Sequence, residues 1–167
     1  MLPDDLSIAF DTPWLTPEHA ARRTELFPAF IHELLGDVYP GLQTFRPSSG
    51  PDGGIDLGWR DRHGLGVIEC KCVKDDWDNI RTAWHATKKH LLDNLTDGTP
   101  RAPQYQPWYD HPITAYHLCT TWHAGKQEQV DTLEADIRAT FAILGGRQGL
   151  AHLADIAVQV VGWGRLR

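Results

Sequence analysis

Three side chains of the types that hydrolyse phosphodiester bonds lie close together in the sequence: Asp56, Glu69 and Lys71. Carboxylate oxygens are the ligands that Mg²⁺ prefers, and Mg²⁺ keeps several of its waters when it binds to protein. A metal-bound water is more acidic and can attack phosphorus, while a neighbouring ammonium group orients that water or offsets the developing charge. The three residues therefore indicate a phosphodiesterase with Mg²⁺ as its cofactor, for which Mn²⁺ can substitute.

A β-hairpin is the predicted scaffold for this group. Residues 55–60 and 65–73 have the composition of strands, and the turn-forming residues 61–64 separate them. Antiparallel pairing about that turn brings Asp56 beside Glu69. We therefore expect the two carboxylates to approach each other from neighbouring strands.

Strand alternation predicts the direction of the side chains in the second strand. Glu69 and Lys71 fall on one face, and Ile68, Cys70 and Cys72 fall on the other. The second face is apolar and belongs in the core. The first face then carries a carboxylate and an ammonium group side by side, at the edge of a cleft.

The remaining segments predict an α/β domain. Helices are expected at 16–35, from Asp75 or Asp76 to Leu95, and at 125–144. Further strands are expected at 42–46, 113–122 and 156–161, and 96–112 reads as a long ordered loop. The order is helix, three strands, helix, strand, helix, strand, which predicts a mixed sheet flanked by helices in a single domain spanning residues 1–167.

Two short segments form a recognisable motif: residues 50–56 read Gly-Pro-Asp-Gly-Gly-Ile-Asp, and residues 67–71 read Val-Ile-Glu-Cys-Lys. Together they resemble the Mrr-like branch of the PD-(D/E)xK restriction-endonuclease superfamily. The order of elements expected over residues 16–161 is also similar to the core of that superfamily. The resemblance implies a restriction-endonuclease-like αβββαβ core and a metal-dependent endonuclease activity.

The resemblance also implies a role for each residue of the motif. Asp56 and Glu69 would ligate the metal, Cys70 would add its backbone carbonyl oxygen, and Lys71 would serve the attacking water. Glu25, on the first helix, is a candidate additional ligand, because related nucleases often place a glutamate there.

Two of these assignments have alternatives. Glu33 is the alternative to Glu25, and a solvated helix face is an equally good interpretation of either glutamate. Asp52 stands in the Pro-Asp pair of the motif and is the alternative ligand to Asp56. We favour Asp56, because it follows the Gly-Gly-Ile step, and expect Asp52 to cap the turn.

Candidate nucleic-acid contacts are sparse. Lys74, Arg81 and Lys88 are the candidates for phosphate contacts, with Lys89 beside them, although single basic side chains on a helix are usually solvated. Trp108, in the long loop, is a candidate contact for a ligand or partner. The net charge of −6 predicts weak intrinsic affinity for phosphates.

The cysteines indicate a reducing compartment. Cys70, Cys72 and Cys119 read as reduced core thiols of a cytoplasmic protein. His117 and His123 accompany Cys119, but no fourth ligand follows at a regular spacing, so zinc is not expected. No apolar run is long enough to span a bilayer, and the N-terminus lacks the basic and apolar regions of a signal peptide.

These features favour an endonuclease acting on nucleic acid, most often DNA in this family, in restriction or antiviral defence. The alternatives are a non-cleaving module of the same fold and a structure-selective repair or junction nuclease, which the acidic charge disfavours. The chain stops just after the last expected strand, which suggests the N-terminal module of a longer protein. A further domain or partner subunit is expected to sense a trigger and to activate the nuclease. Homo-oligomers are also expected, since one such site cuts one strand.

Overall fold

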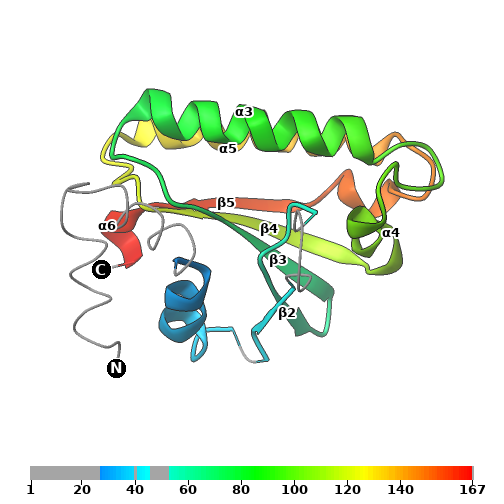
Figure 1. The fold of residues 1–167 in the computed structure, drawn as a ribbon, viewed down its shortest axis with the longest axis horizontal. Coiled ribbons are helices and arrows are strands. Elements are labelled where there is room, and N and C mark those ends of the chain that lie inside the picture. The colour runs from blue at the N-terminus through cyan, green and yellow to red at the C-terminus, as the bar shows by residue number, and fades with distance from the viewer. Residues whose placement is uncertain (1–26, 40, 46–52, 167) are drawn as a thin grey trace.

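The computed structural model describes residues 27–39, 41–45 and 53–166, which form a five-stranded sheet with helices on both faces (Figure 1). The strands follow one another across the sheet as β1 (Gln43–Thr44), β2 (Leu57–Asp61), β3 (Gly64–Lys71), β4 (Ile113–Thr120) and β5 (Ala157–Val161). The first three strands pair antiparallel, and the last three pair parallel. The predicted mixed sheet flanked by helices is therefore confirmed.

The main helices lie where the sequence predicts them, although residues 16–26 of the first expected helix lie outside the described residues, and short helical elements are added. The main ones are residues 27–35, α3 (Trp77–Asn94) and α5 (Gln127–Gly145). Asp76 proves to be the N-cap of α3, and its Oδ1 accepts a hydrogen bond from the backbone N–H of Asp78 at 2.7 Å. The short elements are η1 (Pro103–Tyr105), α4 (Pro107–Asp110) and η2 (Ala151–Leu153).

Two sequence expectations need correction. The segment 96–112 was expected to be a loop, but it contains η1 and α4, each of which begins at a proline whose fixed φ suits the first turn of a helix. No element was expected after the last strand, but α6 (Trp163–Leu166) follows β5. Its Trp163 is buried, which holds this turn against the domain.

The sheet is buried on both faces. Helices α3 and α5 lie side by side over one face, and the helix at residues 27–35 covers the other (Figure 1). The face of β3 that carries Glu69 also carries Leu65 and Val67, which are buried beneath α3 and α5, while Ile68 belongs to the opposite cluster. We expected only the Ile68 face to be core. Parallel strands joined by helical crossovers are usually covered on both faces, so the cleft is confined to the end of β3.

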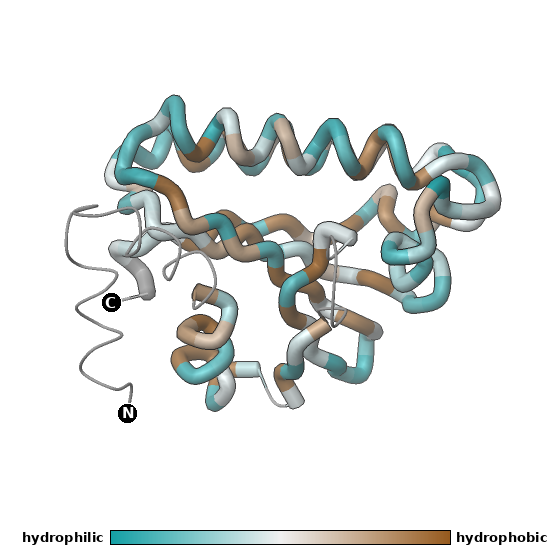
Figure 2. The backbone as a smooth tube through the Cα atoms, viewed as in Figure 1, coloured by the Kyte–Doolittle hydropathy of each residue, from teal (hydrophilic) through white to brown (hydrophobic). Residues whose placement is uncertain are grey.

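Helix α3 is fixed in place by its packing and by one polar cluster. Its outer side is mostly hydrophilic, and its apolar residues turn toward the sheet (Figure 2). The indole Nε1 of Trp84 donates to Asp136 of α5 at 2.6 Å, and the ammonium of Lys88 lies 3.1 Å from the same carboxylate. Burial raises the pKa of Asp136, but the hydrogen bonds from Trp84 and Lys88 outweigh burial, so the pKa is lowered. Asp136 therefore stays ionised and ties α3 to α5.

A buried histidine lies in the cluster on the opposite face. The phenol oxygen of Tyr39 lies 3.1 Å from Nδ1 of His117, and the tilted ring of Trp59 lies 4.9 Å from the imidazole between centroids. Burial lowers the pKa of His117 to about 4. The ring is therefore neutral at neutral pH, and its Nδ1 shares one hydrogen bond with the Tyr39 hydroxyl.

We expect this histidine to make the fold sensitive to acid. The unfolded chain binds a proton at His117 near pH 6.5, whereas the folded chain binds it only near pH 4. Neutral His117 therefore contributes roughly 3 kcal/mol to the free energy of unfolding above pH 6.5. This contribution is lost as the pH falls from 6.5 to about 4. Urea unfolding across this range should show a shallower pH dependence for His117→Gln than for the wild type. A control, His63→Gln at an exposed position, should keep the wild-type slope, and equal slopes for all three proteins would refute the expectation.

Among the described residues, no helix has the length and apolar character needed to cross a membrane.

Candidate active site

Asp56 is held by the sheet although it precedes β2 by one residue. Its backbone N–H donates to the carbonyl oxygen of Ile68 at 2.9 Å, and its carbonyl oxygen accepts from the N–H of Phe45 at 2.9 Å. The last paired positions of the hairpin are Leu57 and Ile68, and Asp56 lies one residue beyond this pair, at the end of the hairpin where Glu69 follows Ile68 in β3. The predicted hairpin is confirmed, and the approach of the two carboxylates to each other stays a prediction.

The carboxylate of Asp56 is oriented by the backbone of the neighbouring strand. Its Oδ2 accepts a hydrogen bond from the N–H of Cys70 at 2.7 Å, and the residue is only 2% exposed. The N–H and C=O of a strand residue point to the same edge of the strand. The Cys70 carbonyl therefore also faces the edge where Asp56 lies, as the predicted set of metal ligands requires.

Glu69 and Lys71 form an ion pair at the end of β3. The ammonium nitrogen of Lys71 lies 2.9 Å from Oε1 of Glu69. Glu69 is buried, at 4% exposure, whereas a quarter of the Lys71 side chain is accessible. As predicted from alternation, the two side chains lie on one face of β3, where Lys71 is the part of the pair that reaches toward solvent.

The turn before Asp56 depends on glycine. Gly53 and Gly54 adopt φ values of 71° and 83°, in the left-handed region that glycine enters without steric cost. A Cβ on Gly53 would lie 2.1 Å from the carbonyl oxygen of Gln104. The close approach of these two backbones presses the turn against η1 and fixes the position from which Asp56 enters the sheet.

Trp108 anchors this turn and does not contact a ligand. Its side chain is fully buried, and its indole Nε1 donates to the carbonyl oxygen of Gly53 at 2.7 Å. The expectation that Trp108 offers a contact to ligand or partner was wrong, because its ring packs in the core against Phe141 and Tyr116.

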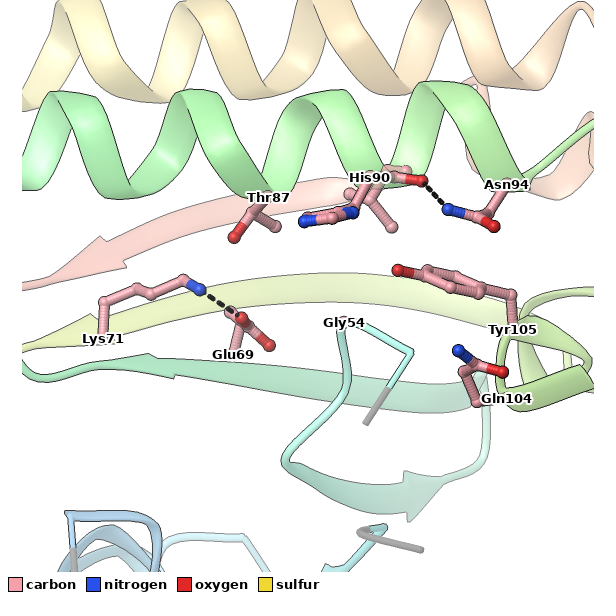
Figure 3. Close-up of a pocket in the computed structure, with 9 residues that line it drawn as sticks. Gly54, Glu69, Lys71, Thr87, His90, Asn94, Gln104 and Tyr105 are labelled. Atoms are coloured by element: carbon pink, nitrogen blue, oxygen red, sulfur yellow. Dashed lines mark hydrogen bonds and ion pairs between the residues drawn. The ribbon is translucent and has the colours of Figure 1, made fainter. Parts of the chain in front are cut away.

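Above the ion pair, the structure has a cleft of about 370 Å³ (Figure 3). Its floor is formed by Glu69, Lys71 and Gly54, its roof by residues of α3, and one end by η1. The residues that complete the lining are Thr87, His90, Leu91, Asn94, Gln104 and Tyr105. Sequence reasoning did not identify any of them as site residues. The spacing of Thr87, His90 and Asn94, at three and four residues along one helix, was the available signal.

The residues present fit a hard divalent cation. Within the described ranges, no three His, Cys, Asp or Glu side chains are grouped as a metal site. A metal here would take ligands from two carboxylates, Asp56 and Glu69, from the Cys70 carbonyl and from water. Such an all-oxygen set with a low number of protein ligands is characteristic of Mg²⁺.

Of the additional ligands considered from the sequence, Glu33 alone lies among the described residues. Glu25 and Asp52 lie outside the described residues. Glu33 is exposed on the helix at residues 27–35, which packs on the face of the sheet opposite the cleft. Glu33 is therefore excluded as a ligand in this arrangement.

The predicted phosphate contacts do not line the cleft. Lys88 pairs with Asp136, and Arg81 pairs with Asp78 at 2.8 Å while its guanidinium lies 5.9 Å from the centre of the Trp77 ring. Lys74 is exposed beyond the end of β3. None of the three predicted contacts is among the residues that line the cleft.

Comparison of the chain with protein-family models, with curated proteins and with solved structures gives no match. The residues of the site and their geometry carry the functional interpretation.

Proposed function

We propose that this chain is the catalytic domain of a divalent-metal-dependent endonuclease with a PD-(D/E)xK site on a restriction-endonuclease-like αβββαβ core. The observation that supports it most directly is the placement of Asp56 and Glu69 at one end of the hairpin, with the Lys71 ammonium 2.9 Å from Glu69 at the floor of a cleft. Two carboxylates and a lysine at the end of one hairpin form a minimal set for metal-dependent phosphodiester hydrolysis.

Each residue has a separate task in this proposal. Bound Mg²⁺, or Mn²⁺ in its place, supplies an acidified water and positive charge beside the phosphate. Asp56 and Glu69 hold the cation, and the hydrogen bond from Cys70 fixes the orientation of the Asp56 carboxylate. Lys71 orients the attacking water and offsets the negative charge that develops on the phosphate. As the water oxygen bonds to phosphorus it would lose one proton to solvent, while the bond to the leaving sugar oxygen breaks and that oxygen takes up a proton from solvent.

DNA is the expected substrate, and restriction or antiviral defence is the expected role. The net charge of −6 gives the domain little attraction for a polyanion, so we propose that a further domain or partner subunit delivers the substrate and activates the site. A homo-oligomer would bring two such sites together on one substrate. The three cysteines form no disulfide with one another, which suits a cytoplasmic location.

The test compares cleavage with metal binding. Purified protein is incubated with circular DNA, single-stranded and duplex, in Mg²⁺ or Mn²⁺, and Mn²⁺ binding is measured by calorimetry. We expect wild-type cleavage that EDTA abolishes. Lys71→Ala should lose cleavage by roughly a hundredfold or more while keeping Mn²⁺ binding, because the ammonium group is not a ligand. Lys89→Ala is the matched control, because Lys89 is exposed, pairs with Asp93 and does not line the cleft.

The outcomes separate the enzyme from a binding module. Nucleic-acid binding that needs no metal, with no cleavage by the wild type, would indicate a non-cleaving module of the same fold. Equal cleavage by Lys71→Ala and Lys89→Ala would contradict the assignment of the site.

A further inference from the structure

The cleft over Glu69 and Lys71 is partly covered by residues of α3. Helix α3, with 18 residues, is about 27 Å long at the usual rise per residue and passes over the floor formed by β3 (Figure 3). Thr87, His90 and Asn94 project from it into the same cleft. The candidate catalytic groups therefore lie under a roof, and a substrate must enter between two walls.

The roof is not free to swing aside. Ile80 and Leu91 of α3 are fully buried in the main core. Trp84 and Lys88 of the same helix both bind Asp136 of α5. Lifting α3 would break these contacts together, and the loss of several buried apolar side chains costs several kcal/mol. The width of the cleft is therefore a fixed property of the fold.

The dimensions of this cleft suit one nucleotide and do not suit a duplex. A volume of about 370 Å³ is near the lower end of the range of small-molecule sites. A duplex is stiff over about 150 base pairs and cannot bend into a covered cleft without a large energetic cost. A single strand is flexible and can thread one nucleotide between two walls.

The chemistry of the walls agrees with this size. Gln104 and Asn94 carry amides, and His90 carries an imidazole, all of which can hydrogen-bond to a base or sugar. The Nδ2 of Asn94 donates to the carbonyl oxygen of His90 at 2.8 Å, which orients the amide at the cleft wall. Proteins that grip duplex DNA neutralise many phosphates with Lys and Arg. Here, Lys71 is the one Lys or Arg among the described residues that line the cleft.

We propose that this cleft accepts a single, unpaired nucleic-acid strand and places one nucleotide between β3 and α3, and that it excludes continuous duplex. The inference rests on the proposed nuclease function and narrows its substrate class. His90 and Gln104 contact the base or sugar of the nucleotide held over Lys71. Duplex is attacked only where its strands have separated.

The first experiment uses DNA without ends. A closed single-stranded circle and a relaxed closed duplex circle of the same sequence are incubated with the full chain in Mg²⁺ or Mn²⁺. We expect the single-stranded circle to be cut at least about tenfold faster. In parallel, fluorescence anisotropy in Ca²⁺ measures the affinity for a labelled oligonucleotide, alone and annealed to its complement, and should favour the single strand by about tenfold.

The second experiment locates the strand with a matched pair of variants. His90→Ala should raise KM and the Kd for the single strand by about fivefold, with kcat little changed, because it removes a hydrogen bond to bound substrate. His85→Ala is the control, because His85 is exposed on the same helix but does not line this cleft. Its KM and Kd should stay at the wild-type values.

The results distinguish the inference from the function on which it rests. Cutting of the relaxed duplex at an equal or higher rate would overturn the single-strand inference and leave the nuclease intact. Selective binding of single strands without any cutting would support the single-strand inference and contradict the proposed nuclease function. Failure to bind or cut either form, or equal effects of His90→Ala and His85→Ala, would overturn the assignment of this cleft to a strand.

Discussion

Asp56→Asn is expected to abolish cleavage while leaving the fold intact. The amide has the shape of the carboxylate, and its oxygen can still accept the hydrogen bond from the Cys70 N–H that holds Asp56 in place. The change removes the negative charge that a divalent cation requires. We expect the rate to fall by roughly a hundredfold to a thousandfold and the affinity for Mn²⁺ to fall with it.

Asp61→Asn is the matched control for this substitution. Asp61 ends the same strand, is exposed, and accepts hydrogen bonds from the N–H groups of His63 and Gly64 in the hairpin turn. It should keep wild-type cleavage and Mn²⁺ affinity. Urea unfolding should show that both variants stay folded, which separates lost chemistry from lost structure. Full activity in Asp56→Asn would remove Asp56 from the site and leave the metal without its first ligand.

Gly53→Ala is expected to destabilise the domain at the edge of the site. A residue with a Cβ is strained at a φ of 71°, and the added carbon would lie 2.1 Å from the carbonyl oxygen of Gln104. Backbone has little room to yield, so we expect the free energy of unfolding to fall by about 2–4 kcal/mol. The turn would also move away from η1, which weakens the hydrogen bond between Trp108 and the Gly53 carbonyl.

Urea unfolding of Gly53→Ala beside Gly125→Ala tests this expectation. Gly125 has an ordinary φ, and a Cβ there would meet no atom within 4 Å. Its substitution should leave stability unchanged or raise it slightly, because alanine restricts the unfolded chain. A Gly53→Ala protein as stable as Gly125→Ala would show that the turn can shift without cost.

The hairpin of the candidate site could be predicted because its determinants are local. A turn signal at residues 61–64 and strict alternation in the second strand fixed both the pairing and the faces. The register then placed Asp56 and Glu69 at the same end of the hairpin by counting alone. The large helices were also predictable, because the residues that form their apolar stripes and caps lie within one continuous segment of the sequence.

The rest of the site depends on contacts between distant segments. Trp108 looked like an exposed aromatic residue in a loop, but the tertiary fold brings it beneath Gly53 and buries it. His90 lines the cleft because α3 lies over β3. Local sequence patterns do not predict that placement. Lys88 looked like a surface cation, and its partner Asp136 lies on another helix. In each case the deciding contact joins residues that local periodicity cannot relate.

The floor and the roof of the cleft come from two separate stretches of chain. The groups proposed to hold the cation lie between Gly53 and Lys71, and the lining of the opposite wall lies between Thr87 and Tyr105. The residues proposed for the reaction and those proposed for substrate selection thus lie in different segments of the sequence. One segment can change while the other stays constant. Relatives of this domain could diverge in the substrate that they accept by changing a few positions of α3 and η1. The hairpin proposed to perform the reaction would stay unchanged.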